Sequence, residues 1–242
     1  KGGFNMKKIL SILISMAFCF SVSAKSRGDT MALDSRCKSI VEISAYIAVS
    51  NLDGLKKAME EGLEAGLSVN EIGELCVQSY AYVGFPRSLL AEGVLTSIVK
   101  EADEKGKELE WGEKAKEVPS DLEKYEYGRE KINSLFGRNA KQSRPVSTDY
   151  NSSTDIFLKE HLFTDIFYRG VLSDKERELS TATMLASLGN VNPMFTSHTQ
   201  GAFKNGNSKE ELEEMALIVG KLIGKKEGRN AENIVKQVTG AK

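Results

Sequence analysis

The feature that most constrains this chain is residues 66–87, which read GLSVNEIGELCVQSYAYVGFPR. Ser68 and Glu71 have the Ser-x-x-Glu spacing of a capping box, in which each side chain satisfies a free amide at a helix start. Gly66 suits the left-handed end of a preceding helix. Apolar side chains then recur at helical spacing as far as Val83. The segment predicts a helix ending near 65, a second over about 69–83, and a third from about 86 after the Gly-Phe-Pro break.

A weaker copy of this segment lies 140 residues further along the chain. The ungapped alignment of residues 66–92 with 206–232 keeps glycines, capping residues and acids, matching Gly66 with Gly206, Ser68 with Ser208, Glu71 with Glu211, Glu74 with Glu214, Gly84 with Gly224, Ala91 with Ala231 and Glu92 with Glu232. Self-similarity at a fixed offset is typical of repeated structural units. We therefore predict a duplicated helical unit.

Helical periodicity continues through most of the chain, and no alternating strand pattern competes with it. A third capping box, at Ser173 and Glu176, marks another helix start. The predicted fold class is all-α. We expect helices at about 35–50, 52–65, 69–83 and 86–104 in a first unit, and at about 121–136, 155–168, 174–188, 194–204, 209–223 and 228–239 in a second.

These elements predict a first, partial unit over 35–104 and a second, complete domain over 121–240, with a charged connector and loop over 105–154. Residues 100–131 are dense in Glu and Lys, which favours a solvated, helix-rich connector. Residues 139–154 contain Ser, Asn, Thr and Pro145 and are typical of a loop.

The N-terminal residues have the layout of a secretory signal peptide. Met6 and two lysines precede an apolar run over 9–20, and a small-residue cleavage site ends at Ala24. The run is too short to span a bilayer, which needs about 20 residues. The five residues before Met6 read as a translated purine-rich ribosome-binding sequence, which implies a bacterial gene. We expect residues 1–24 to be removed, and a periplasmic or secreted protein without a membrane anchor.

Charge and residue types exclude several kinds of partner. The formal charge is −1, and removing residues 1–24 takes away three lysines and no acid, which leaves −4. No basic stripe suits nucleic acid. Two histidines 37 residues apart, with no Cys cluster, do not form a metal motif, and no glycine-rich nucleotide loop is present. We therefore expect no nucleic-acid partner, no metal and no cofactor.

Two cysteines, Cys37 and Cys76, remain after the predicted cleavage. In an oxidising compartment they could form a disulfide. The alternative, two small buried residues, is favoured because each lies in a predicted helix.

Two segments carry a family resemblance. GLSxxEIxE running into YxGFPR in residues 66–87, and then Phe163–Arg169, Leu172–Leu179, His198 and the Gly206 segment in that order, resemble the carboxymuconolactone decarboxylase family. The resemblance implies a helical fold of the alkylhydroperoxidase D type. It also implies a ring-shaped homo-oligomer, and for a tandem chain we expect a trimer.

Glu178 and His198 are the candidate acid/base pair. They lie 20 residues apart on consecutive predicted helices, which a hairpin would bring face to face. A carboxylate fixes the tautomer of an adjacent imidazole, an arrangement suited to general acid/base catalysis. From spacing alone a structural salt link is the stronger interpretation. The resemblance favours catalysis, because both positions match the glutamate and histidine of the family's active-site region.

The first unit lacks this pair, since Lys38 aligns with Glu178 and Ala58 with His198. It keeps instead a group of aromatic residues and one cation that the second unit has lost, namely Tyr80, Tyr82, Phe85 and Arg87. The two units are therefore candidates to share one substrate pocket, although the tyrosines suit ordinary core positions equally well.

Arg87 and Arg169 are candidates to bind a substrate carboxylate, because a guanidinium presents two parallel donors. Either could equally pair with surface acids, and for Arg169 we favour that structural role. His161 is expected to be a packed or exposed histidine.

Two classes of function follow from the resemblance. An alkylhydroperoxidase is disfavoured, because no Cys-x-x-Cys lies between Glu178 and His198 and only Cys76, alone or with Cys37, could supply a thiolate. We predict a lyase that acts by acid/base chemistry on a small lactone or related carboxylic acid. The alternative outside catalysis is a periplasmic oligomer that binds a small molecule.

Overall fold

The all-α prediction is confirmed. We describe a computed structural model, in which residues 32–137 and 152–240 are described and form helices with no strand among them. None of the described helices is long and apolar enough to cross a membrane. The predicted signal peptide and residues 139–151 of the predicted loop over 139–154 lie outside the described residues. Residues 152–154 are described and are helical, so the loop prediction is wrong there.

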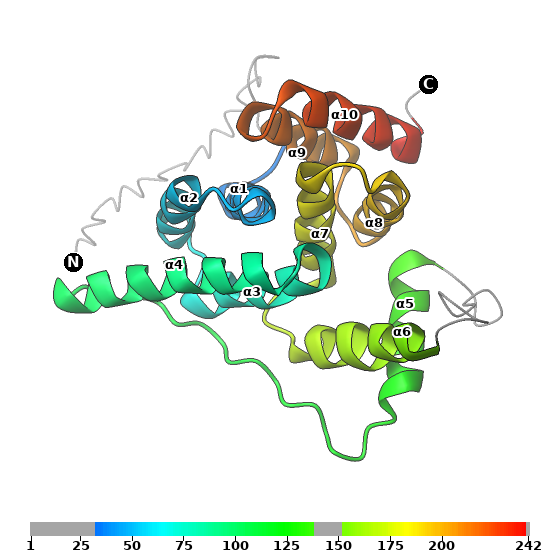
Figure 1. Cartoon of the computed structure of the whole chain (residues 1–242), viewed down its shortest axis with the longest axis horizontal. Helices are drawn as coiled ribbons and strands as arrows, with labels where there is room; N and C mark the ends of the chain where they lie inside the picture. The colour runs from blue at the N-terminus through cyan, green and yellow to red at the C-terminus, as the bar shows by residue number, and fades with distance from the viewer. Residues whose placement is uncertain (1–31, 138–151, 241–242) are drawn as a thin grey trace, which may run out of the picture. The chain divides into compact units, whose positions relative to one another are not determined.

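The first four-helix unit consists of α1–α4, and Figure 1 shows these helices in blue to green. Their bounds are Ser35–Val49, Leu52–Glu64, Val69–Val83 and Phe85–Glu104. Both hydrogen bonds of the predicted capping box at Ser68 and Glu71 are present. Gly84 separates α3 from α4 with a φ of 87°, a backbone conformation that residues with a Cβ atom rarely adopt. The predicted boundaries are therefore confirmed within two residues.

The second four-helix unit, α7–α10, repeats the arrangement of the first. Its helices are Asp174–Leu188, Asn192–Lys204, Lys209–Leu222 and Lys225–Thr239. In the first unit, α1 packs on α2, and α4 packs on α2 and α3. In the second unit, α7 packs on α8, and α10 packs on α8 and α9. The aligned residues 66–92 and 206–232 lie mostly in α3 and α4 and in α9 and α10.

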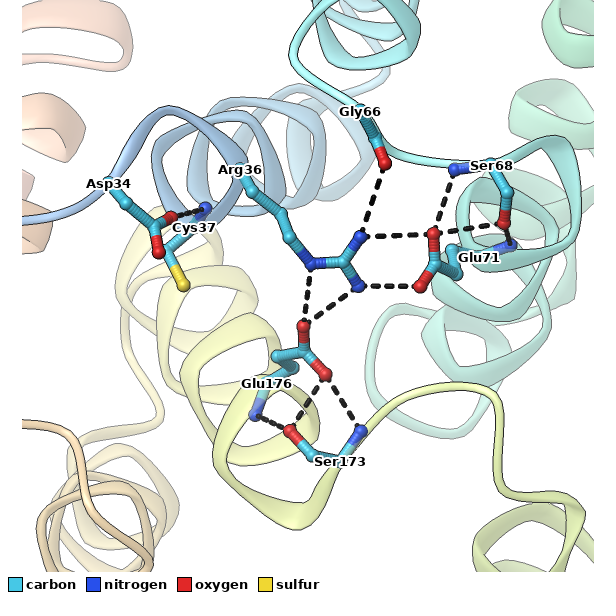
Figure 2. A network of polar contacts seen from close by, with 8 residues as sticks. All are labelled: Asp34, Arg36, Cys37, Gly66, Ser68, Glu71, Ser173 and Glu176. Atoms are coloured by element: carbon cyan, nitrogen blue, oxygen red, sulfur yellow. Dashed lines mark hydrogen bonds and ion pairs between the residues drawn. The ribbon is translucent and has the colours of Figure 1, made fainter. Parts of the chain in front are cut away.

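The two units pack through α1 and α7. In addition, α3 contacts α7, and α9 contacts α1. Figure 2 shows that Arg36 of α1 lies between two capping boxes, one from each unit. Its guanidinium donates to Glu71 at 2.6 Å and to Glu176 at 2.9 Å. The capping glutamates therefore hold their own helix starts and also join the two units.

A second, buried link joins α3 to the second unit. Glu74 is 3% exposed and accepts hydrogen bonds from Arg169 at 2.8 Å and from Arg177 at 3.1 Å. Arg177 is fully buried and also donates to Gln78 and to the Gly170 carbonyl. A buried carboxylate paired with two guanidiniums is strongly destabilised when one partner is removed.

The prediction of a helix-rich connector is wrong between α4 and α5. Residues 107–119 form no helix, and Figure 1 shows this long non-helical segment. The carbonyls of Glu110 and Trp111 accept hydrogen bonds from the backbone amides of Val69 and Asn70, at 2.9 and 3.1 Å. Those amides begin α3 and have no partner within the helix. The backbone of the connector therefore caps the start of α3, which a connector folded into a helix could not do.

Four further elements precede the second unit. They are α5 (Lys124–Phe136), α6 (Ser152–Ile156), the π-helix η1 (Phe157–Ile166) and the short 3₁₀ helix η2 (Phe167–Arg169). The predicted helix over 155–168 is thus present, but most of it is π-helical. The Thr164 hydroxyl donates to the Lys159 carbonyl five residues earlier, in keeping with the wider π turn. Segments of this kind are frequent at functional sites.

Candidate active site

Glu178 and His198 lie in contact. Glu178 is on α7 and fully buried, and His198 is on α8 and 8% exposed. The His198 Nδ1 atom lies 2.9 Å from Glu178 Oε2. An ionised carboxylate only accepts hydrogen bonds, so Nδ1 is the donor and Nε2 is left for another partner. The pair has the geometry of an oriented acid/base group.

Gly201, one turn after His198, provides the space that the carboxylate occupies. A Cβ atom at this position would lie 2.5 Å from Glu178 Oε2 and 2.9 Å from the Phe136 ring. The second oxygen, Oε1, is buried with no hydrogen-bond partner among the described residues. A buried carboxylate oxygen without a partner is unfavourable for folding, and a catalytic role is one explanation for such a group.

Two aromatic rings hold the imidazole edge-on. Tyr82 of α3 lies 5.2 Å from His198 between ring centroids, and Phe136 of α5 lies 5.3 Å away on another side. Burial of the Tyr82 hydroxyl raises its pKa, and the negative charge of Glu178 raises it further. Thr181 and the charge of Arg177 act in the opposite direction and are outweighed. Tyr82 is therefore a neutral phenol beside the acid/base pair.

A pocket of about 370 Å³ opens beside His198. Its lining is mostly apolar and comes from both four-helix units and from α5 to η1. The lining residues are Ala81, Tyr82, Ile132, Phe136, Asp155, Leu158, Lys159, Leu162, Phe163, Leu185, Leu188, Val191, Met194, Ser197 and His198. Met194 is 55% exposed and so marks the mouth. The size and lining suit a small molecule with an apolar body.

A second polar group, which the sequence analysis did not identify, lines the same pocket. Lys159 of η1 is 3% exposed, and its ammonium lies 2.6 and 2.8 Å from the two carboxylate oxygens of Asp155. The Tyr125 hydroxyl completes a triangle, at 2.8 Å from Lys159 and 2.7 Å from Asp155. Burial opposes the charge on Lys159, but Asp155 and Tyr125 outweigh it and raise its pKa. Lys159 is therefore a fixed cation.

The backbone of α5 fits closely against this lysine. A Cβ atom at Gly128 would lie 2.0 Å from the Lys159 carbonyl oxygen, so only glycine lets α5 approach η1. The i, i+4 spacing of Asp155 and Lys159 between apolar residues was the available sequence signal. Alone, that spacing fits an exposed ion pair equally well.

The first-unit aromatic residues do not all reach the pocket. Tyr82 lines it, but Tyr80 and Phe85 stack on each other at the surface, with ring centroids 4.4 Å apart. The Tyr80 hydroxyl bonds to His161, which is 52% exposed and also pairs with Asp165 at 2.9 Å. Of the predicted aromatic wall, one tyrosine therefore lies beside His198.

Neither candidate arginine is among the lining residues. Arg169 is held by Glu74, the structural role that we favoured, and Arg87 donates to the Val83 carbonyl at 2.9 Å. Among the described residues, the lysine or arginine that lines the pocket is instead Lys159.

Cys37 and Cys76 are free and buried. Burial raises the pKa of the Cys37 thiol to about 12, with Asp34 adding to the effect, and burial likewise raises the pKa of Cys76. A nucleophilic thiolate needs the opposite shift. In the part of the chain described, no three His, Cys, Asp or Glu side chains are grouped to hold a metal ion.

The fold and the site define a class: an all-helical protein with a buried Glu–His pair at an apolar, small-molecule pocket. Residues 157–236, from the first residue of η1 into α10, match the sequence model of the carboxymuconolactone decarboxylase family. The matched segment contains both Glu178 and His198. No curated protein matches the chain.

Proposed function

We propose that the protein is a lyase of the carboxymuconolactone decarboxylase type, acting on a small lactone or related carboxylic acid. The family domain supports this class of function. The observation that carries the proposal is the buried 2.9 Å contact between Glu178 and His198 at an apolar pocket. Among the described residues, Glu178 Oε1 has no partner, and Gly201 leaves space for the carboxylate. Both features are better explained by an active site than by a salt link that stabilises the fold.

In the proposed reaction, the bond between a carbon of the lactone and the carboxylate carbon breaks, and carbon dioxide leaves. The electron pair of that bond stays in the conjugated lactone as a dienolate. Protonated His198 then gives its Nε2 proton to a carbon of the dienolate, while Glu178 holds Nδ1 and stabilises the imidazolium. Solvent returns the proton to the ring. A positioned acid of this kind contributes about 10²–10⁴-fold in rate.

The pocket walls support this chemistry in a second way. Tyr82 offers a neutral hydroxyl-bearing ring next to the imidazole, and the surrounding aliphatic side chains limit the access of water. In a poorly hydrated site the fixed dipoles and charges act more strongly on a developing charge than they would in water.

An alkylhydroperoxidase-like activity is the second family function. Its chemistry needs a thiolate, and the buried thiols of Cys37 and Cys76, with raised pKa values, argue against it. The third candidate is a binding protein without catalysis, which the apolar pocket would also suit. His198 distinguishes these candidates, since a binding protein needs no proton transfer.

The test follows absorbance and released carbon dioxide when the purified protein meets carboxymuconolactone and several related lactone acids. We expect turnover of at least one compound by the wild type and its loss, by at least about 10²-fold, in a folded His198→Ala variant. His161→Ala is the matched control, because that histidine does not line the pocket. Turnover that survives in folded His198→Ala would exclude the proposed role.

Assembly and location are further parts of the proposal. We propose a homo-oligomer, with a trimer expected. Phe85, Leu89 and Leu90 of α4 are exposed apolar side chains and support a contact surface there. We also propose export to the periplasm or medium, on the strength of the N-terminal sequence pattern.

A further inference from the structure

The charges around the pocket restrict what can enter it. Among the described residues that line the pocket, Lys159 is the one lysine or arginine, and Asp155 is the one acid. Both are almost fully buried, at 3% and 4% exposed. The ion pair therefore adds no net charge to the pocket.

Lys159 also has no hydrogen left to donate. An ammonium has three N–H donors. The two oxygens of Asp155 and the hydroxyl of Tyr125 lie within 2.6–2.8 Å of the nitrogen and account for all three. A substrate carboxylate would have to displace one of these partners.

Two further described cations, both bound by α3, are equally committed. Arg169 and Arg177 are held by Glu74, outside the lining. His198 offers one nitrogen, and Glu178 behind it is a further negative charge. Among the described residues, the pocket thus offers a polar group for one anionic or carbonyl oxygen and no uncommitted cation for a second carboxylate. Burying an unpaired carboxylate is very unfavourable.

We infer that the pocket selects a mainly apolar molecule with at most one carboxylate, and that Asp155 sets this limit by neutralising Lys159. The inference deepens the proposed function, because it takes this pocket as the substrate site. It excludes a lactone with two carboxylates, such as carboxymuconolactone, as the preferred ligand. It favours a ring compound with one carboxylate and a similar or larger apolar area.

The test compares 3-phenylpropionate with phenylsuccinate, which share a phenyl ring and differ in the number of carboxylates. Equilibrium binding to the full chain is measured by calorimetry at neutral pH, so the outcome does not depend on turnover. For the wild type we expect binding of 3-phenylpropionate that is at least about tenfold tighter than binding of phenylsuccinate. Equal affinities, tighter phenylsuccinate binding, or no binding of either compound by folded protein would overturn the inference.

Asp155→Asn is the decisive variant, because it keeps the side-chain shape and leaves the Lys159 charge uncompensated. We expect phenylsuccinate affinity to rise at least about tenfold, since a freed ammonium makes charge-assisted hydrogen bonds. The matched control is Asp174→Asn, which frees Lys131 from a 2.7 Å ion pair outside the pocket and should change neither affinity. An unchanged preference in folded Asp155→Asn would contradict the role of Asp155.

Two more variants guard against misfolding. The double variant Asp155→Asn with Lys159→Gln removes both charges and should restore the wild-type preference for one carboxylate. Tyr125→Phe removes one acceptor from Lys159 and should raise phenylsuccinate affinity about two- to threefold. If Asp155→Asn does not fold, no change in Tyr125→Phe would overturn the inference.

Discussion

The two four-helix units pack in the same way and differ in what their matching positions hold. Lys38 of α1 is partly exposed and pairs with Glu42 at 3.7 Å, whereas the aligned Glu178 of α7 is fully buried against His198. Ala58 packs in the apolar core of the first unit at the position of His198. The helical framework is thus compatible with both an inert core and a site. A few side chains determine which one forms.

The second unit also gains walls that the first does not share. Phe136 of α5 and Lys159 of η1 close the pocket around His198. On the opposite side, Tyr82 comes from the first unit. The acid/base pair therefore belongs to the second unit, while the walls around it also come from the first unit and from α5, α6 and η1.

The largest expected effect concerns an aligned pair of acids, Glu74 and Glu214. Glu74→Gln should lower the free energy of unfolding by about 3–5 kcal/mol, because it leaves buried Arg177 without its carboxylate. Glu214 accepts from the backbone amides of Ala32 and Leu33 near the surface, so Glu214→Gln should cost about 1 kcal/mol. Urea unfolding followed by circular dichroism measures both. Equal losses would show that the two positions are equivalent.

The next effect compares two helical glycines. Gly201→Ala should destabilise the protein by about 1–3 kcal/mol and lower any turnover, because the new methyl group displaces the Glu178 carboxylate. Gly93→Ala in α4 meets no atom within 4 Å and should stabilise by about 0.5–1 kcal/mol. Thermal unfolding and the activity assay check both variants. A fully active Gly201→Ala protein would mean that the carboxylate position is not critical.

A smaller effect concerns the link between the units at Arg36. Arg36→Met should cost about 1 kcal/mol at neutral pH, since the guanidinium is partly exposed. Burial of Glu71 is outweighed by Arg36 and Ser68, so its pKa is lowered below the usual 4.5. A carboxyl group whose pKa is lowered by folding stabilises the folded state at pH values above its unfolded-state pKa. This stabilisation is lost as the pH falls below that value.

The wild type should therefore lose more stability than Arg36→Met when pH falls below about 4.5. Urea unfolding of both proteins at neutral and acidic pH tests this difference. Parallel losses in the two proteins would show that Arg36 does not couple to Glu71.

The smallest effect should come from the cysteines. Cys37→Ala and Cys76→Ala should leave turnover within about twofold, because neither thiol lines the pocket. Folded protein should also resist a thiol reagent at mildly alkaline pH, since both thiols are buried and have raised pKa values. A peroxidase activity that disappears in Cys76→Ala would instead favour the alkylhydroperoxidase alternative.

Local signals in the sequence were sufficient to predict the helices. Capping boxes, glycine stops and 3.6-residue periodicity act within a few residues, and α3, α7 and α9 begin where the serine and glutamate pairs indicate. The connector could not be predicted in this way. It forms no helix, and its carbonyls accept hydrogen bonds from the start of α3, some 40 residues earlier in the chain. A charge-rich composition carries no information about such a contact.

The site was predictable only in part, for a related reason. The spacing of Glu178 and His198 fits one hairpin, and the structure places them in contact. Lys159 and Asp155 reach the same pocket through the packing of η1 on α5 at Gly128, which no local pattern indicates. Arg87 and Arg169 have suitable chemistry, but neither lines the pocket.

The most direct test of a single acid/base site in the second unit uses the two histidines, which give two ring signals in nuclear magnetic resonance. His161→Asn assigns the signals, and 3-phenylpropionate is then titrated into the wild-type protein. We predict that the His198 signal shifts with saturation while the exposed His161 signal stays in place. We also predict that His198 carries its proton on Nδ1, held by Glu178. A titration that moves His161 and leaves His198 unchanged would contradict the account.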